Sequence, residues 1–161
     1  MRKCVRCLTP ETVDTITFDN AGVCSVCRQI EFKKDKIDWE TRGRALQELI
    51  AEYKGKGLYD CIVPYSGGKD SVFQLYYIIR VLKLKPLVVR FNHWGYRPLV
   101  EENNTSVFKQ LGCDVVEFTP NWHVVRETML EAFKRRGDFC WHCHTGIYAG
   151  VMQMAVRFEV P

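Results

Sequence analysis

The hydrophobic and polar positions of this chain alternate in a regular way between residues 58 and 161. Short apolar runs such as Cys61-Ile62-Val63 and Leu87-Val88-Val89 are separated by stretches in which apolar side chains recur every three or four residues. The first pattern is typical of strands buried on both faces, and the second of amphipathic helices. The patterns predict strands at 59–64, 86–91 and 114–118 and helices at 71–82, 99–111 and 121–136. This order predicts an α/β fold with a parallel sheet and helices on both faces.

The end of the sequence predicts an incomplete sheet. Residues 146–157 have a helical pattern, and Phe158 to Pro161 are predicted to open a fourth strand. A parallel sheet of three strands leaves a strand edge unpaired, and such edges pair readily with other chains. We therefore expect a truncated domain, or one that forms homo-oligomers through its open sheet edge.

Residues 1–57 are organised differently. The first 30 residues hold two Cys-x-x-Cys pairs, a short β-like run at 15–18 and a turn ending at Gly22, which predicts a small separate module. Residues 31–57 are predicted to be a charged connector followed by a helix that begins after Asp38 and runs to about Tyr53. The expected domains are therefore 1–30, 31–57 and 58–161.

Composition and charge narrow the class of protein. The chain has 161 residues, 47% of them hydrophobic, and a net charge of +4 from basic and acidic residues mixed along the sequence. This composition is typical of a folded globular domain and disfavours a nucleic-acid-binding arm. No signal-peptide pattern opens the chain, and its apolar stretches are too short to span a bilayer. We expect a cytoplasmic protein without a membrane partner, in which cysteines serve more often as metal ligands or redox groups than in disulfides.

A loop of small residues gives the strongest chemical signal. The segment Tyr65-Ser66-Gly67-Gly68-Lys69-Asp70-Ser71 follows one predicted strand and precedes a helix. There, backbone N–H groups converge at a helix N-terminus, glycines allow close approach, serines add hydroxyl donors and Lys69 adds a cation, which together favour phosphate binding. Asp70 is expected to bind Mg²⁺ or to cap the helix. The spacing differs from the Walker A pattern, and the plain alternative is a glycine turn that binds nothing.

The pairs Cys4-x-x-Cys7 and Cys24-x-x-Cys27 have the spacing of a structural zinc site. A turn between the pairs can bring them together, and four thiolates complete a tetrahedral site with no open position. Such a site would fold about thirty residues that cannot bury a core unaided. Iron binding and oxidation-prone cysteines are the alternatives.

A second cysteine and histidine group, Phe139-Cys140-Trp141-His142-Cys143-His144, follows the helix predicted at 121–136. In one hypothesis Cys140 and Cys143 bind a metal or iron–sulfur cluster, or form a redox pair, with a further cysteine beyond the end of the sequence. In a second, His142 or His144 contacts substrate ahead of a helix N-terminus. In the third, the cysteines are structural and the histidines lie on the surface. Cys61 and Cys113 fall at strand positions, and we expect them in the core.

The residues 66–71 match the S-G-G-K-D-S signature of the PP-loop ATP pyrophosphatases residue for residue. With the opening Cys4-x-x-Cys7-Leu-Thr-Pro-Glu-Thr, the run from Ile16 to Cys27 and Cys140-Trp141-His142-Cys143, the chain resembles the N-acetyl sugar amidotransferase family. These are enzymes of surface-polysaccharide biosynthesis, in the lipopolysaccharide O-antigen and pseudaminic acid pathways. The resemblance spans nearly the whole chain. It implies an adenine nucleotide alpha hydrolase-like domain, of which this sequence would be the N-terminal part.

The resemblance also implies a site and a reaction. Lys69 and Asp70 would be catalytic, residues 66–71 would hold the phosphates of ATP with Mg²⁺, and Asn92 and His93 would lie beside the adenosine or the α-phosphate. The alternative for His93 is a loop histidine with a structural role and no catalytic one. The enzyme would transfer AMP to the carbonyl oxygen of an N-acetyl sugar and release pyrophosphate, and ammonia would then displace AMP to leave an acetamidino group. Glutaminase or ammonia-channelling subunits would be its partners.

Two other functions stay open. ATP-dependent sulfur transfer to tRNA uses the same adenylation followed by a sulfur nucleophile, for which Cys140 and Cys143 are candidates. Against it, the sequence has no basic patch with interleaved aromatic residues beyond 134–136. The remaining alternative is a zinc-knuckle interaction module with a degenerate nucleotide fold, which binds partners and not ATP.

Overall fold

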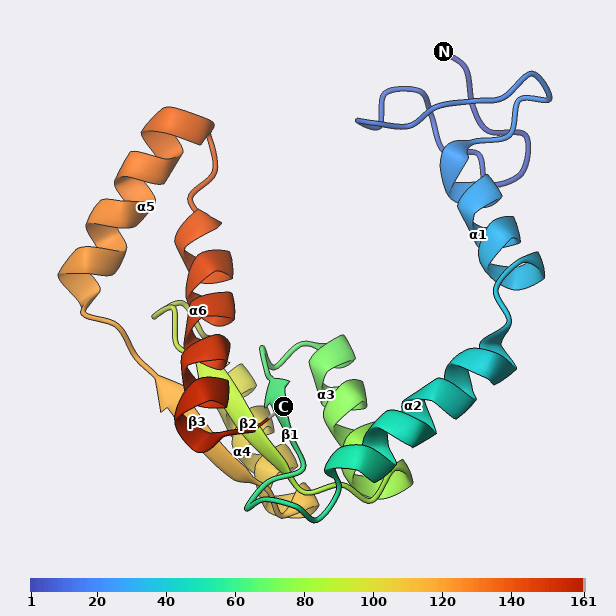
Figure 1. Ribbon diagram of the computed structural model, residues 1–161. Helices are drawn as coiled ribbons and strands as arrows, with labels where there is room; N and C mark the ends of the chain where they lie inside the picture. Colours follow the sequence, from blue (N-terminus) through green and yellow to red (C-terminus); the bar gives the residue numbers. More distant parts are fainter. Residues whose placement is uncertain (161) are drawn as a thin grey trace. The chain divides into compact units, whose positions relative to one another are not determined.

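The computed structural model describes residues 1–160 and divides the chain into two compact units, Met1–Leu49 and Ile50–Pro161 (Figure 1). The first unit opens with an irregular segment in which two isolated antiparallel bridges pair Lys3 with Pro10 and Phe18 with Cys24. Two helices follow, α1 (Ser25–Asp35) and α2 (Trp39–Tyr53), and α2 crosses the division between the units.

Helix α1 corrects one expectation from the sequence. Residues 31–35, expected in a charged connector, are helical, so α1 runs across the boundary that we placed after residue 30. The charge run suggested a linker, but lysine and glutamate are good helix formers and the helix starts inside the cysteine module. The expectation for α2 is confirmed, because Asp38 Oδ1 accepts a hydrogen bond from the Thr41 backbone N–H at 3.0 Å and caps the helix.

The second unit is built on a parallel sheet of three strands, β1 (Cys61–Pro64), β2 (Pro86–Phe91) and β3 (Asp114–Phe118). Their order is β1-β2-β3, and the register pairs Val63 with Val88 and Val88 with Val115. All six residues of β2 are buried, as expected for a central strand covered on both faces. The α/β class and the parallel sheet predicted from the sequence are therefore confirmed.

One face of the sheet is covered by helices α3 (Lys69–Tyr76) and α4 (Pro98–Leu111) and by the π-helical turn η1 (Tyr77–Val81), which continues α3. Their apolar side chains pack with those of the strands around a buried cluster of Val63, Tyr65, Leu75 and Val88. Cys61 and Cys113 pack against this cluster and are half-buried. Burial raises the pKa of the Cys61 thiol to about 11, in keeping with a core residue.

The other face carries α6 (Trp141–Phe158), which packs on β2 and β1, and α5 (Trp122–Arg136), which packs on α6. In Figure 1, α6 lies in front of the sheet and α4 behind it. At Gly146, α6 lies so close to the sheet that a Cβ atom would overlap the Phe91 ring. Helices therefore cover both faces, as the sequence predicted.

Two expectations about α6 were wrong. It begins at Trp141 and not near 146, so Cys143 and both histidines of its motif are helical. It also extends through Phe158, whose ring packs edge-on against Tyr59 at 6.2 Å, and ends at Glu159 in the left-handed conformation, with φ of 52°. Phe158 and Glu159 thus belong to a helix and its cap, not to a strand, and Pro161 lies outside the described residues.

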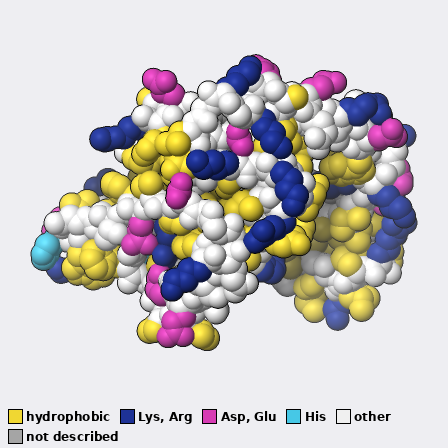
Figure 2. All heavy atoms as spheres, turned by 90° about the horizontal axis from the view of Figure 1, so that it is seen from below, with side chains coloured by type: hydrophobic (Ala, Val, Ile, Leu, Met, Phe, Trp, Pro, Cys, Tyr) yellow, Lys and Arg dark blue, Asp and Glu magenta, His cyan; other side chains and the backbone are white. Residues whose placement is uncertain are grey.

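The strands β1 and β3 each have one neighbour in the sheet. Beside β1, a cavity of about 620 Å³ is lined by Ile62 of the strand and by Met152 and Ala155 of α6, among others. Hydrophobic side chains also reach the surface between lysine and arginine residues (Figure 2). Among the described residues, no helix has both the length and the apolar character that crossing a membrane requires.

Candidate functional site

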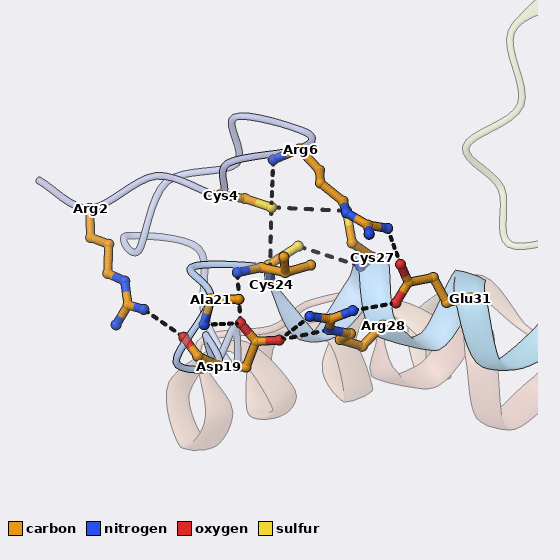
Figure 3. Close-up of polar contacts among 10 residues, drawn as sticks. Arg2, Cys4, Arg6, Asp19, Ala21, Cys24, Cys27, Arg28 and Glu31 are labelled. Atoms are coloured by element: carbon orange, nitrogen blue, oxygen red, sulfur yellow. Dashed lines mark hydrogen bonds and ion pairs between the residues drawn. The ribbon is translucent and has the colours of Figure 1, made fainter.

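The four cysteines of the first unit form a compact cluster. Their sulfur atoms all lie within 4.8 Å of one another. Among the described residues, these cysteines form the group of three or more cysteine, histidine or acidic side chains that lie close enough together to hold a metal ion. Cys4 Sγ lies 3.9 Å from Cys27 Sγ, and Cys7 Sγ lies 3.5 Å from Cys24 Sγ. Figure 3 shows Cys4, Cys24 and Cys27 turned toward one another. The structure thus brings together the two pairs that the sequence singled out.

Backbone amides point at the sulfur atoms and favour their ionised form. Cys4 Sγ accepts from the N–H groups of Arg6 at 3.4 Å and Cys24 at 3.3 Å. Hydrogen bonds from backbone N–H groups, with that of Cys7 the strongest, lower the pKa of the Cys4 thiol to about 6. The contacts with neighbouring thiols, Cys7 first, raise the pKa of Cys27 to about 12. Four thiolates at these distances repel one another, so the cluster is suited to a bound cation.

A polar network outside the cysteines holds the two ends of the module. Asp19 Oδ1 accepts from the N–H groups of Ala21 and Val23, both at 2.9 Å, which shapes the turn before Cys24. Arg28 joins Asp19 to Glu31, and Arg6 also contacts Glu31 (Figure 3). Apart from these contacts the module has little to fold around, because its buried cluster consists of Cys4, Val23 and Cys24. A metal bound by the four sulfurs would supply the missing stabilisation.

The segment Tyr65–Ser71, which we call the glycine loop, leaves β1 and enters α3. Tyr65 is buried and its N–H donates to Val89 O at 2.9 Å, which fixes the start of the loop beside β2. Gly67 has φ of +82°, a left-handed conformation that strongly favours glycine. The loop therefore has the strand–turn–helix context that the sequence predicted.

The exposed side of the glycine loop presents donors. The first backbone hydrogen bond of α3 runs from Val72 N–H to Gly68 O, so the amides of residues 69–71 have no helical partner. Ser71 Oγ lies 3.2 Å from Ser66 Oγ, and Lys69 and Asp70 pair with each other at 2.7 Å while their side chains are 88% and 90% exposed. An anion can reach these amides, the hydroxyls and the ammonium group directly. The cavity lined by Asp60, Lys85 and Asp114 lies elsewhere, where strands begin.

Asn92 and His93 follow β2 at the same edge of the sheet, but Asn92 already has partners. Its side chain donates to Glu117 Oε1 at 3.1 Å and accepts from Trp94 N–H at 2.9 Å. This contact holds Trp94 at φ of 65°, which is uncommon for a residue with a side chain. Asn92 therefore shapes the turn after β2.

His93 is half-buried at this turn. Its Nδ1 accepts from Gly95 N–H at 3.1 Å, which leaves the proton on Nε2, and its ring lies 4.3 Å from that of Tyr96. Burial, first among several causes, lowers the pKa of His93 below its usual value. The ring is therefore neutral at neutral pH, and it can donate one hydrogen bond from Nε2.

Arg90, for which the sequence carries no local signal, is charged and yet buried in β2. Its guanidinium makes two hydrogen bonds to Glu101, at 2.9 and 2.7 Å, and an ion pair with Glu117 at 3.0 Å. It also lies over the Tyr96 ring, 4.8 Å from the centroid. The group joins α4, β3 and the turn after β2 beside the candidate site.

The second cysteine pair lies at the start of α6. Cys140 is exposed and immediately precedes the helix, and Cys143 is half-buried in its first turn, where its N–H donates to Cys140 O at 3.0 Å. Burial raises the pKa of Cys143. Within the described residues no third metal-binding side chain joins this pair in a cluster. His142 Nδ1 lies 2.9 Å from Phe139 O, while His144 is exposed.

Comparisons with known proteins give one distant relative and no function. No family model matches the chain. The chain is 28% identical over 143 residues to the uncharacterized protein MJ1599 of Methanocaldococcus jannaschii, a match that covers 88% of this chain and 50% of that protein. The chain therefore spans about half the length of this relative.

Proposed function

We propose that this chain is the nucleotide-binding part of an AMP-forming ATP pyrophosphatase, an amidotransferase that adenylates the carbonyl of an N-acetyl sugar. The observation that carries the proposal is the glycine loop, in which amides without a helical partner, two hydroxyls and an exposed lysine lie where a buried strand gives way to a helix. Such an arrangement is suited to an oligophosphate. The match of Ser66–Ser71 to the PP-loop signature favours one such ligand, the β- and γ-phosphates of ATP.

Each residue of the loop has a role in this proposal. The amides of residues 69–71 and the Ser66 and Ser71 hydroxyls bind the β- and γ-phosphates, and Lys69 neutralises the charge that develops on pyrophosphate. Asp70 fits Mg²⁺ binding, because it is an exposed carboxylate beside the phosphates and Mg²⁺ is usually held by one or two carboxylates and phosphate oxygens. His93 can donate from Nε2 to the nucleotide, whereas Asn92 keeps its structural contacts.

The reaction has a simple balance. The carbonyl oxygen of the N-acetyl group attacks the α-phosphorus of ATP, and the bond to the bridging oxygen breaks to release pyrophosphate. Ammonia then adds to the carbonyl carbon and loses protons, and AMP leaves with the former carbonyl oxygen. The product is an acetamidino sugar, as in surface-polysaccharide and O-antigen biosynthesis. Ammonia is scarce at neutral pH, so glutaminase partners would supply it, in the cytoplasm where ATP and glutamine are available.

We further propose that the four-cysteine cluster binds zinc. Sulfur ligands in a closed tetrahedral set suit Zn²⁺, which supplies folding free energy and no redox chemistry. The pair Cys140 and Cys143 remains outside this site.

A binding experiment tests the phosphate site. ATP with Mg²⁺ should raise the melting temperature of the second unit, because a ligand that binds the folded state stabilises it. At a ligand concentration one hundred times Kd, the free energy of unfolding rises by about 2.7 kcal/mol. Lys69→Ala should remove most of this rise. The measurement is thermal unfolding followed with and without ATP and Mg²⁺, with assay of AMP and pyrophosphate when an N-acetyl sugar and ammonia are added.

Lys85→Ala is the matched control, since Lys85 lies just before β2, at the opposite end of that strand from the turn at Asn92 and His93. It should leave the rise unchanged. If Lys69→Ala keeps the full rise, the glycine loop is not the nucleotide site. If the wild-type protein shows no rise, the zinc-knuckle interaction module becomes the better account.

Sulfur transfer to tRNA is the second candidate, and one observation favours it. Cys143 lies in the first turn of α6, the helix that packs against Phe91 at the end of β2, next to the turn that carries His93. A sulfur nucleophile there could reach an adenylated substrate. The product distinguishes the two candidates, because sulfur transfer leaves a thiolated nucleotide and the amidotransferase leaves an amidine.

A further inference from the structure

Asn104 is a polar side chain buried beneath the glycine loop. It lies on α4 and is 1% exposed, in the layer where Tyr65 and Phe108 pack with ring centroids 4.8 Å apart. A carboxamide in such apolar surroundings costs free energy unless its donors and acceptor are all bonded. Its presence there therefore needs an explanation.

Only one end of this carboxamide is bonded. The Tyr65 hydroxyl donates to Asn104 Oδ1 at 3.2 Å. Asn104 Nδ2, which carries two hydrogens, has no hydrogen-bond partner among the described residues and no exposure to water. A buried donor without an acceptor is rare in folded proteins and often marks a functional constraint.

The unbonded amide lies directly under Gly67. A Cβ atom on this glycine would sit 2.7 Å from Asn104 Oδ1 and 3.0 Å from Nδ2. The Gly67 backbone therefore rests on the carboxamide of Asn104. Steric contact and the positive φ both require glycine at this position.

The loop has few other supports on this side. The Ser71 hydroxyl donates to Gly68 O at 3.0 Å, whereas the contacts of Ser66 N–H with Ser71 Oγ and of Gly68 N–H with Ser66 Oγ are long, at 3.4 Å. Asn104, in contrast, is held by the helix and by Tyr65. The carboxamide is thus the rigid surface against which the loop takes its shape.

The geometry of a peptide group connects these observations. The N–H and C=O of one planar peptide point in opposite directions. When the Gly68 N–H turns outward toward an anion, the Gly67 carbonyl of the same peptide turns inward, toward Asn104 Nδ2 beneath Gly67. An inward carbonyl would give Nδ2 the acceptor that it lacks.

We propose that Asn104 is a positioning residue for the phosphate site: it supports Gly67, and its Nδ2 donates to a loop carbonyl when the loop amides face an oxyanion. This inference rests on the proposed function of the glycine loop. It adds a residue from a different helix, which the signature of the loop does not contain. Asn104 acts through the loop and does not contact the reacting atoms.

The variant Asn104→Leu tests the proposal. Leucine has a similar shape and removes both polar ends, so the free protein should unfold at a urea concentration close to that of wild type, because removal of an unbonded buried donor offsets the loss of the acceptor of the Tyr65 hydroxyl. The Kd for pyrophosphate with Mg²⁺, measured by calorimetry, should rise about tenfold or more, as expected for loss of a hydrogen bond that supports charge binding. In NMR spectra, the amide signals of Gly67 and Gly68 should move less on adding pyrophosphate than they do in wild type.

Tyr65→Phe is the matched control, since it removes the partner of Oδ1 and leaves Nδ2 in place. It should change the Kd for pyrophosphate by less than about threefold. If Asn104→Leu folds poorly, Asn104→Ala gives the same loss of the donor with less bulk.

The outcomes separate the two proposals. Wild-type protein that binds neither pyrophosphate nor ATP contradicts the function of the loop, and this inference with it. Wild-type binding with unchanged affinity in Asn104→Leu contradicts the role of Asn104 alone. A parallel loss of stability and affinity also contradicts it, because that result describes an ordinary core residue.

Discussion

At the scale of single residues, Arg90 shows how a charge is accommodated in the central strand. Its side chain is 7% exposed and is paired with Glu101 and Glu117. The Arg90 guanidinium, through its hydrogen bonds, lowers the pKa of Glu101 below the usual glutamate value. This contribution to stability is fully present above the unfolded glutamate pKa of about 4.3 and is lost as the pH falls through the lower pKa of the folded state.

We expect Glu101→Gln to lower the free energy of unfolding by about 1.5 kcal/mol at pH 7, because half-exposed Glu101 is the bidentate partner of a buried cation. The difference from wild type should be smaller at about pH 3, which lies below the unfolded glutamate pKa of about 4.3, and should disappear once the pH falls below the pKa of the folded state. Urea unfolding at the two pH values measures both effects. Glu102→Gln, on the exposed side of α4, is the control and should behave like wild type. A difference that stays constant with pH would mean that the charge of Glu101 is not the cause.

Residues whose partners are close in sequence were predictable, and those with distant partners were not. The glycine loop and the cysteine pairs carry their signals in short local spacings, so the sequence located them. Arg90 and Asn104 depend on partners 11 to 39 residues away, Glu101 and Tyr65, which only the packing of α4 on the sheet brings close. In the sequence, Asn104 was one polar residue in an amphipathic helix.

At the scale of elements, the same division holds. The strands β2 and β3 have the bounds that apolar periodicity predicted, because each is a short run between turns. The predicted bounds of helices were less accurate where cysteines, histidines or runs of charged residues interrupted the apolar pattern. The cysteines and histidines of 140–144 suggested a ligand loop, yet all of them except Cys140, which precedes the helix, lie in the first turn of α6. The charges of 31–35 suggested a connector although they continue α1.

Helix α5 gives a test at this scale. Asn121 Oδ1 accepts from His123 N–H at 2.9 Å and caps the helix. Asn121→Ala should lower the free energy of unfolding by about 1 kcal/mol, since an N-terminal amide loses its acceptor. Asn121→Asp keeps the acceptor and should be within a few tenths of a kcal/mol of wild type. Equal losses in both variants, measured by urea unfolding, would point to a contact other than the cap.

At the scale of the whole molecule, the two units have different sources of stability. The second has an apolar core between its sheet and helices α3 and α4, whereas the first has a buried cluster of three residues and four converging thiols. Metal removal should therefore act on the first unit alone. We expect a strong chelator to expose the backbone amides of residues 1–35 while leaving the sheet protected.

Hydrogen exchange followed by mass spectrometry measures this difference segment by segment. Once the chelator has been removed, the rise in melting temperature caused by ATP with Mg²⁺ should persist in the metal-free protein, because the glycine loop belongs to the second unit. Restoring zinc should restore protection in the first unit. Unchanged exchange of residues 1–35 after the metal is removed would show that the module folds without it.

Gly146 has a consequence that reaches well past its own position. Because a side chain at this point of α6 would overlap the Phe91 ring, glycine lets the helix backbone lie directly against the end of β2. A bulkier residue would act as a wedge and tilt the helix, carrying the turn with Cys140 and Cys143 away from the end of β2. The distance between the second cysteine pair and the loops after the strands thus depends on the absence of a side chain at Gly146.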